Sequence, residues 1–451
     1  MMNVKEFQDT YRYTESNKKT KLTAFFIVGI ILSFFLYNTY EQAVFSILGI
    51  ALLFLSALFL DCRELWVVAV FLTPNIAMLK FLDFPNAIHS YYLILIELKY
   101  FIYEKKCSFK MEGVFLLCVI SACLTSLCIG DYSVLISYLR TLLLLLLLYN
   151  FMRDKKSDAY NKRVIDSFVY GATANVICGV FYYVIRNKNI FNGYFAAINN
   201  DRNYFSTVLA VAIALIVLYL QKYKTSELSF KITCLVILCA GGVISMSRTF
   251  IIAMVWVALM FAIMMFNARK KRNLLILLLI GIFIFFMYFD TVMAVVTRVL
   301  ARFTDSTVQG GNGRIEIWGD YLSLTFSTPL RMLFGNGLAI NYVNSGVFVY
   351  IEHNTLIQMI SSIGFLGSCS MLVCYYTVYS NVLTKNKFFQ NIFAYMPLLV
   401  AFTGYFNISA FFLAHFDISV FVCIIAIDLY KKKEIASQGV TKSQIAIKTY
   451  T

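Results

Sequence analysis

Residues 310–337, GGNGRIEIWGDYLSLTFSTPLRMLFGNG, hold three charged groups within seven residues of a chain that is otherwise strongly apolar. These are Arg314, Glu316 and Asp320. An arginine stays protonated, and its planar guanidinium can bind a phosphate through two parallel hydrogen bonds. If a helix begins here, Arg314 lies in its first turn, where the helix dipole disfavours a cation unless an anion lies beside it. The segment therefore favours an anionic ligand near Arg314.

Other residues could take part in chemistry because they interrupt or border apolar sequence. Arg248 lies in SMSRTFII, where it breaks a long apolar run, and a charge at the centre of a membrane costs at least about 2.5 kcal/mol. His353 precedes another apolar run, and an unperturbed histidine, with a pKa of about 6.5, can take up a proton near neutral pH. There are ordinary alternatives: an arginine can reach lipid phosphates from a span end, and a histidine there can form a helix-end hydrogen bond. Arg140, in SYLRTLLLLLLLYN, raises the same question as Arg248.

The composition places most of the chain in lipid. Of its 451 residues, 60% are hydrophobic and 14% are charged, against roughly 25% charged in soluble domains. Apolar runs of about 20 residues recur along the chain, which predicts an all-α polytopic membrane protein of about 12–14 transmembrane helices. The first 21 residues are polar and lack a cleavage-site pattern, so we expect no removable signal peptide. The fourteen candidate spans are 22–37, 43–60, 64–80, 88–103, 112–129, 133–151, 164–185, 204–221, 232–247, 249–267, 273–290, 354–383, 391–406 and 409–430.

Lys and Arg are unevenly distributed between alternate loops. With the N-terminus in the cytoplasm, the inner segments hold 28 of the 39 Lys and Arg, and the outer segments hold eight. By the positive-inside rule, both termini are expected to face the cytoplasm. Seven of the eight outer cations are Arg, which again favours an anionic ligand on the outer side. The expected organisation is a cytoplasmic segment (1–21), transmembrane helices (22–290), a large extracytoplasmic loop (291–353), C-terminal transmembrane helices (354–430) and a cytoplasmic tail (431–451).

Several classes of site and partner are disfavoured. The eleven cysteines lie mainly in apolar runs or short basic loops, so we expect them to be unpaired. The chain has no CxxC pair, no H-E-x-x-H and no phosphate loop ending in GK[ST], so no metal or cofactor is expected. The net charge of +15 is explained by topology, and a nucleic-acid partner is not expected.

Within the loop, one segment has helical spacing. In RIEIWGDYLSLTF, the apolar residues Ile315, Trp318, Leu322 and Phe326 recur at helical intervals, which predicts an amphipathic helix lying at the membrane surface. The sequence STP at 327–329 is expected to end this helix, and the following FGNG to form a turn.

Taken together, these segments resemble the O-antigen ligase and polymerase family, above all its large extracytoplasmic loop. The resemblance lies in Arg314, Trp318, Pro329, Gly335-x-Gly337, His353-Asn354 and the following apolar span that contains Gly364. The stretch NNDRNYFSTVLAVAIAL at 199–215 is similar to the family's Asn-rich start of a span, and SMSRTFIIA at 245–253 is similar to its Ser-Arg motif. The motifs cover roughly residues 195–370, and the pattern of spans covers the whole chain.

Members of this family are metal-independent glycosyltransferases embedded in the bacterial cytoplasmic membrane. They transfer a glycan from a polyprenyl diphosphate carrier, such as undecaprenyl diphosphate, to an acceptor hydroxyl on the outer side. The resemblance implies that Arg248 and Arg314 bind the diphosphate, that His353 is the base for the acceptor, and that direct displacement inverts the anomeric centre. Glu352, or another neighbouring residue, would orient His353. Weaker candidates for binding diphosphate or sugar are Arg202, Arg140, Arg298, Arg302 and Asn354.

Three functions remain open at this point. A polymerase would extend lipid-linked repeat units into O-antigen, capsular polysaccharide or exopolysaccharide, and a ligase would deliver the glycan to a lipid A core or a protein. We favour the polymerase because such proteins are more numerous and diverse. A transporter or flippase of lipid-linked sugar is disfavoured because the candidate cations cluster at the outer face. The expected partners are the lipid-linked donor and a glycan acceptor within the lipid bilayer, with a chain-length regulator and a flippase as further candidates.

Overall fold

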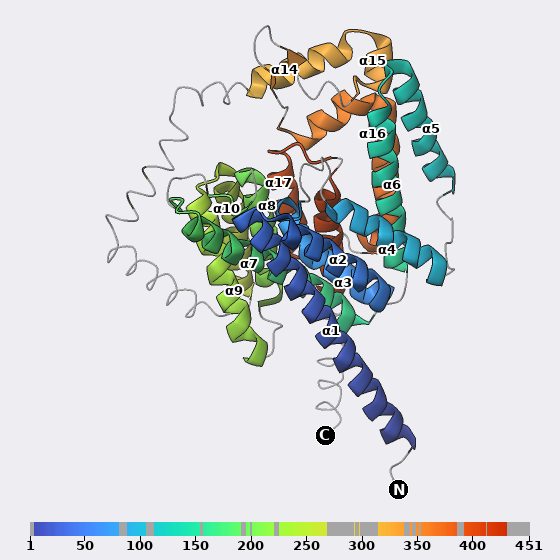
Figure 1. The fold of residues 1–451 in the computed structure, drawn as a ribbon. Coiled ribbons are helices and arrows are strands. Elements are labelled where there is room, and N and C mark those ends of the chain that lie inside the picture. The colour runs from blue at the N-terminus through green and yellow to red at the C-terminus, as the bar shows by residue number, and fades with distance from the viewer. Residues whose placement is uncertain are drawn as a thin grey trace, which may run out of the picture.

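The computed structural model describes residues 4–80, 88–104, 112–153, 157–190, 195–198, 201–220, 225–267, 293, 297, 314–337, 343–344, 349–350, 353–385, 392–411 and 413–430. Within these residues the fold is a bundle of α-helices with one short antiparallel pair of strands (Figure 1). The elements are α1 (Val4–Tyr40), α2 (Ala43–Phe59), α3 (Cys62–Leu72), the 3-10 helix η1 (Thr73–Met78), α4 (Ile88–Glu104), α5 (Glu112–Ile129), α6 (Tyr132–Arg153), α7 (Asp158–Ile185), α8 (Arg202–Tyr219), α9 (Thr225–Ser245), α10 (Arg248–Asn267), α14 (Arg314–Phe326), α15 (Pro329–Phe334), β1 (Val343–Asn344), β2 (Val349–Tyr350), α16 (Thr355–Lys385) and α17 (Ile392–Tyr405). A further helix covers 414–430.

The helices agree with the predicted spans. Thirteen of the fourteen fall on helices, one of them on α3 and η1 together, and the remaining span, 273–290, lies outside the described residues. Six helices, namely α1, α6, α7, α8, α9 and α16, are long and apolar enough to cross a membrane. The predicted all-α polytopic membrane fold is therefore confirmed. The polar segment 1–21 is helical from Val4, and its helix is continuous with the first span.

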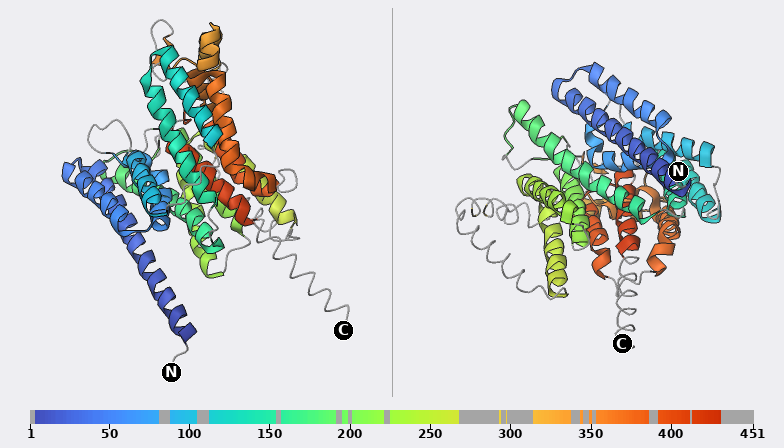
Figure 2. Two further views of the ribbon diagram at one scale, coloured as in Figure 1. Left: turned by 90° about the vertical axis from the view of Figure 1, so that its right-hand side faces the viewer. Right: turned by 90° about the horizontal axis from the view of Figure 1, so that it is seen from below.

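The bundle is organised around α8. Every residue of α8 from Tyr204 to Tyr219 is buried, as expected for a helix that is apolar on all sides. It packs against α7, α9, α10 and α17. A second group, α5, α6 and α16, packs side by side (Figure 2). The start of α8 thus lies among several helices that can bring side chains to it.

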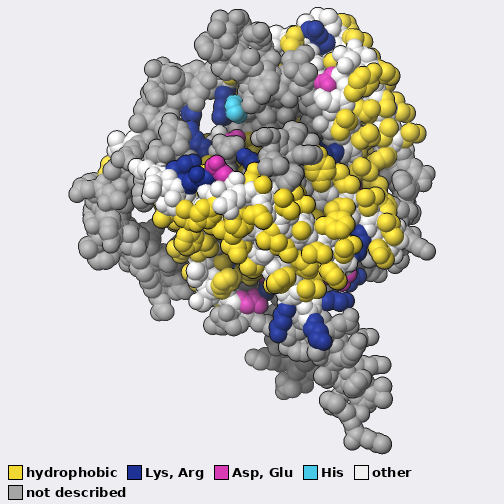
Figure 3. Space-filling model, viewed as in Figure 1, with side chains coloured by type: hydrophobic (Ala, Val, Ile, Leu, Met, Phe, Trp, Pro, Cys, Tyr) yellow, Lys and Arg dark blue, Asp and Glu magenta, His cyan; other side chains and the backbone are white. Residues whose placement is uncertain are grey.

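One end of the bundle is held by ion pairs between helix starts. The Glu64 carboxylate in α3 accepts two hydrogen bonds of 2.6 Å from the Arg163 guanidinium in α7, and a third of 2.5 Å from the Thr23 hydroxyl. Lys231 pairs with Asp166 at 2.6 Å. The helix that carries Thr23, α1, begins at the end of the bundle opposite α14 and α15 (Figure 1). Figure 3 shows a broad apolar band with Lys and Arg gathered along its lower edge.

We expect Glu64→Gln to lower the apparent Tm of the purified protein by several degrees. The substitution removes the charge of a buried carboxylate and leaves the partly buried Arg163 without its partner, which costs on the order of 3 kcal/mol. Glu227→Gln is the matched control, because the Glu227 side chain, paired with Lys162, is 40% exposed against 10% for Glu64. Such exposed pairs contribute only about 0–1 kcal/mol. Thermal unfolding in one detergent, followed by tryptophan fluorescence, measures both shifts, and equal shifts would contradict the expectation.

At the opposite end, α14 and α15 dock on a break in α16. Gly364 has φ 63° and ψ −172°, a conformation that interrupts the helix and is essentially restricted to glycine. A Cβ at Gly364 would lie 2.4 Å from the carbonyl oxygen of Leu333, and one at Gly335 would lie 2.5 Å from the backbone of Ser362. These glycines therefore allow a close approach of two backbones.

The predicted turn at FGNG makes this contact. The backbone N–H of Asn336 donates to the Ser361 carbonyl at 2.7 Å, and that of Gly337 donates to the Ser362 carbonyl at 3.1 Å. The Asn336 side chain also donates to the Thr325 hydroxyl at 2.8 Å. Because Thr325 belongs to α14, this network fixes α14 relative to α16.

The predicted loop helix is confirmed in its bounds, but a different face packs on the protein. α14 spans Arg314–Phe326, which is the predicted segment, and α15 begins at Pro329. The buried residues are Tyr321 and Thr325, whereas Ile315 is 65% and Phe326 50% exposed. The predicted apolar stripe is therefore turned partly outward, as an amphipathic helix at a membrane surface requires.

Candidate functional site

The first residues of α8 form one wall of the candidate site. The Asp201 carboxylate accepts hydrogen bonds from the backbone N–H groups of Asn203 at 2.7 Å and Tyr204 at 3.4 Å. An aspartate at this position satisfies N–H groups that the helix itself leaves unpaired. The cap fixes where Asp201, Arg202 and Asn203 lie at the helix end.

The segment around Arg248 is held against the same helix start. The Ser247 hydroxyl donates to the side-chain oxygen of Asn203 at 3.0 Å. The hydroxyls of Ser245 and Ser206 lie 3.0 Å apart. The serines that interrupt the apolar sequence thus connect the turn between α9 and α10 to α8, and they place Arg248, the first residue of α10, beside the N-terminus of α8.

Arg314 reaches this place from α14. Its Nη1 donates to the side-chain oxygen of Asn407 at 3.3 Å, in the turn that follows α17. Burial lowers the pKa of Arg314 from its ordinary value, the cation of Arg248 lowers it further, and the carboxylate of Asp201 opposes both. Arg314 nevertheless stays protonated, because an arginine side chain remains charged in proteins. Two partly desolvated guanidinium groups near one carboxylate make a strong environment for an anion.

His353 lies near the same charges. Burial lowers the pKa of His353 from its usual value of 6.5, the cation of Arg314 lowers it further, and Asp201 opposes both. The imidazole is therefore neutral at neutral pH and able to accept a proton. The backbone of His353 has φ 45°, an uncommon conformation for a residue other than glycine and one that tends to occur at functional sites.

A polar cavity of about 560 Å³ adjoins His353. Its wall includes Tyr182, Tyr183, Lys188, Asp201, Arg202 and His353. The ammonium of Lys188 lies 4.9 Å from the centre of the Tyr182 ring and 5.9 Å from that of Tyr183. In the upper part of Figure 3, a histidine and basic side chains are visible close together. The cavity offers aromatic faces and several polar groups to a ligand that could present a hydroxyl to His353.

The structure brings together four of the residues singled out from the sequence. Arg314 interacts electrostatically with both Arg248 and His353, and Arg202 shares the cavity with His353. Two other predicted residues have different interactions. The charge of Arg140 interacts with that of Asp417 in the helix 414–430. The side-chain oxygen of Asn354 caps α16 by accepting hydrogen bonds from the backbone N–H groups of Leu356 and Ile357. Arg298, Arg302 and Glu352 lie outside the described residues.

Two residues that were not predicted interact with the predicted ones, Asp201 through its charge and Asn407 through a hydrogen bond. The sequence does offer a signal for Asp201, an acidic residue next to Arg202 in the NNDRNY stretch at the start of a span. Asn407 has no such signal, because it lies 93 residues from Arg314, whose hydrogen bond it accepts. Asp201 is an acidic residue whose charge acts on His353, whereas Glu352, which was expected to orient His353, lies outside the described residues.

Within the described part of the chain, no three His, Cys, Asp or Glu side chains are grouped so as to hold a metal ion. Comparisons of the chain with models of known protein families, with curated proteins and with solved structures find no match.

Proposed function

We propose that the chain is a membrane-embedded glycosyltransferase that polymerises polyprenyl-diphosphate-linked repeat units on the outer side of the bacterial cytoplasmic membrane. The observation that carries the proposal is the convergence of Arg248, Arg314 and His353. They come from α10, α14 and the start of α16, and their charges act on one another. Cations for a diphosphate and a neutral base for a hydroxyl are the groups that this reaction requires.

In the proposed reaction, the acceptor hydroxyl attacks the anomeric carbon of the donor sugar as the C–O bond to the diphosphate breaks. Arg248 and Arg314 stabilise the negative charge that stays on the departing diphosphate. His353 takes the proton of the attacking hydroxyl. Attack from the side opposite the leaving group inverts the anomeric centre. Asp201 is a positioning residue whose carboxylate raises the pKa of both Arg314 and His353.

The polar cavity beside His353 supports a binding site for the acceptor glycan. Tyrosine faces together with a few charged and hydroxyl groups suit a sugar better than a purely apolar ligand. A second lipid-linked repeat unit in this cavity would make the protein a polymerase, and a lipid A core or a protein would make it a ligase. α1 begins at the end of the bundle opposite α14, which is consistent with a cytoplasmic N-terminus and an outer site.

The function is tested with purified protein in nanodiscs, a lipid-diphosphate-linked repeat unit and EDTA, with products separated on a gel. A ladder of glycan lengths is the expected result. Single transfer to an added lipid A core without a ladder would establish the ligase instead. A separate assay in proteoliposomes measures movement of the donor across the membrane. Such movement, with neither polymerisation nor transfer to a lipid A core, would establish a transporter and contradict the proposal.

The pH dependence of kcat/KM should report His353. Because its pKa lies below 6.5, activity is expected to be level above that pH and to fall as the pH drops through the lowered pKa. Asp201→Asn keeps a helix-capping side chain but removes the charge that raises this pKa, so the acidic limb should move to lower pH. Asp320→Asn on the exposed side of α14 is the control and should leave the limb in place. If the acidic limb of the kcat/KM profile moved to higher pH in Asp201→Asn, His353 would be excluded as the titrating base.

A further inference from the structure

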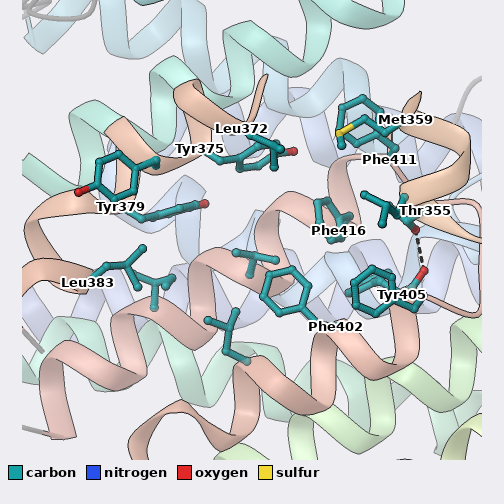
Figure 4. Close-up of a pocket in the computed structure, with 16 residues that line it drawn as sticks. Thr355, Met359, Leu372, Tyr375, Tyr379, Leu383, Phe402, Tyr405, Phe411 and Phe416 are labelled. Atoms are coloured by element: carbon teal, nitrogen blue, oxygen red, sulfur yellow. Dashed lines mark hydrogen bonds between the residues drawn. The ribbon is translucent and has the colours of Figure 1, made fainter. Parts of the chain in front are cut away.

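A second cavity, of about 340 Å³, lies between α16, α17 and the helix 414–430 (Figure 4). Side chains of α16, including Leu372, Tyr375 and Tyr379, face Phe402 and Tyr405 of α17 across it (Figure 4). No polar atom of the wall is exposed to the cavity. We call this cavity the aromatic groove.

The hydroxyl groups of three groove residues are hydrogen-bonded within the protein. Thr355 donates to the carbonyls of Tyr405 and Ile408, both at 2.7 Å. Tyr375 donates to Asp417, and Tyr405 donates to Ser419 at 2.8 Å. The Tyr379 hydroxyl is buried without a hydrogen-bond partner among the described residues. Because no polar atom of the wall is exposed to the cavity, the groove offers a ligand mainly apolar contact.

The aromatic groove begins at the candidate site. Thr355 in its wall is two residues from His353. Phe406, also in the wall, precedes Asn407, which accepts the hydrogen bond of Arg314 at 3.3 Å. An anionic head bound by Arg314 would therefore have this apolar opening directly beside it.

From there the groove follows α16 away from the site. Beyond the break at Gly364, its wall on α16 runs from Leu372 to Leu383, a distance of about 16 Å at the helical rise per residue. That is about half the thickness of the hydrocarbon core of a bilayer, roughly 30 Å. The rim is open, since Leu372 is 55%, Tyr376 58% and Phe406 45% exposed. A long chain could enter it sideways from the bilayer.

We infer that the aromatic groove holds the isoprenoid tail of the lipid carrier while the diphosphate lies at Arg248 and Arg314. The inference rests on the proposed function for the identity of the head group. The tail joined to that diphosphate must leave the charged site within a few ångströms, and the groove is the apolar surface that starts there. Binding the tail sets the position of the diphosphate, and it selects donors with long tails over short ones.

The test combines labelling with chain-length dependence. A long-chain polyprenyl diphosphate that carries a diazirine on an isoprene unit near the head is photoactivated with the full-length protein in nanodiscs, and the labelled residues are mapped by mass spectrometry. The expected label lies on α16, α17 and 414–430, is displaced by unlabelled polyprenyl diphosphate and is not displaced by excess phosphatidylglycerol. Displacement by phosphatidylglycerol to the same extent would show an ordinary lipid site and overturn the inference.

Leu372→Trp narrows the groove, and Val373→Trp is the matched control, because Val373 is the next residue, is 46% exposed and is not in the groove wall. We expect Leu372→Trp to lower kcat/KM for a long-tailed donor by about tenfold, as losing the burial of one or two methylene groups would. A two-isoprene donor should be unaffected, and Val373→Trp should leave both donors unchanged. Equal effects on the two donors would overturn the inference.

The two proposals fail separately. If the label maps to the groove while no donor is turned over, the tail site stands and the glycosyltransferase proposal fails. If turnover proceeds while the label spreads over other helices, the transferase stands and the groove proposal fails.

Discussion

Replacing Arg314 with Ala is expected to lower kcat/KM for the lipid-linked donor by about 10²–10³-fold, the usual cost of losing one preorganised group that stabilises charge in the transition state. Arg248→Ala should have a loss of the same order. The effects should be less than additive, because the two guanidinium groups repel each other in the free protein and act on the same diphosphate. Steady-state kinetics with the purified variants measure each loss.

Two further variants show whether charge alone is sufficient at this position. Arg314→Lys keeps the charge but loses the planar fork, so it should recover only part of the activity. Arg331→Ala is the control at the same end of the molecule, where the Arg331 guanidinium donates to Ser327 in an exposed position. Full activity in Arg314→Ala would show that the cluster does not bind the leaving group.

The second large effect is expected at Gly364, at the break in α16. Ala at this position places a Cβ 2.4 Å from the Leu333 carbonyl oxygen and forces a conformation that Ala disfavours. We expect α14 and α15 to separate from α16, which moves Arg314. Activity should fall by about 100-fold, since a displacement of 1 Å can have that effect.

Gly319→Ala is the matched control for Gly364→Ala. Gly319 lies in α14, and a Cβ there meets no atom within 4 Å, so the change should preserve activity and favour the helix. Amide exchange supplies a second readout. The N–H groups of Asn336 and Gly337, which bond to α16, should exchange faster in Gly364→Ala and at the normal rate in Gly319→Ala. Unchanged exchange and activity in Gly364→Ala would contradict the role given to the docking contact.

Much of the fold could be predicted from local sequence. Apolar runs locate the spans because each run must fill the hydrocarbon core by itself. The bounds of α14 follow from the STP sequence at 327–329, which stops a helix by the fixed geometry of proline. Arg248, Arg314 and His353 could be identified from the sequence as candidate site residues. Ionisable residues within or beside apolar runs are costly in a membrane and therefore indicate function.

The remaining features depend on contacts between distant segments. The glycine at 364 breaks a helix because the backbone of Leu333 approaches it, and neither segment alone reveals this. Asp201 acts on His353 across about 150 positions of sequence. The spacing of apolar residues in α14 did not reveal the face that packs on the protein, which consists of Tyr321 and Thr325, because apolar residues at a membrane surface can face lipid.

The most direct test of the account is the single-turnover rate of glycan transfer by His353→Ala, measured with saturating donor. Because Arg248 and Arg314 remain in place, the variant should bind the lipid-linked donor with nearly normal affinity. The rate of transfer should fall by at least about 100-fold, as expected for loss of a general base. Transfer at the normal rate by His353→Ala would contradict the central claim that a base at the start of α16 acts beside a diphosphate held by arginines.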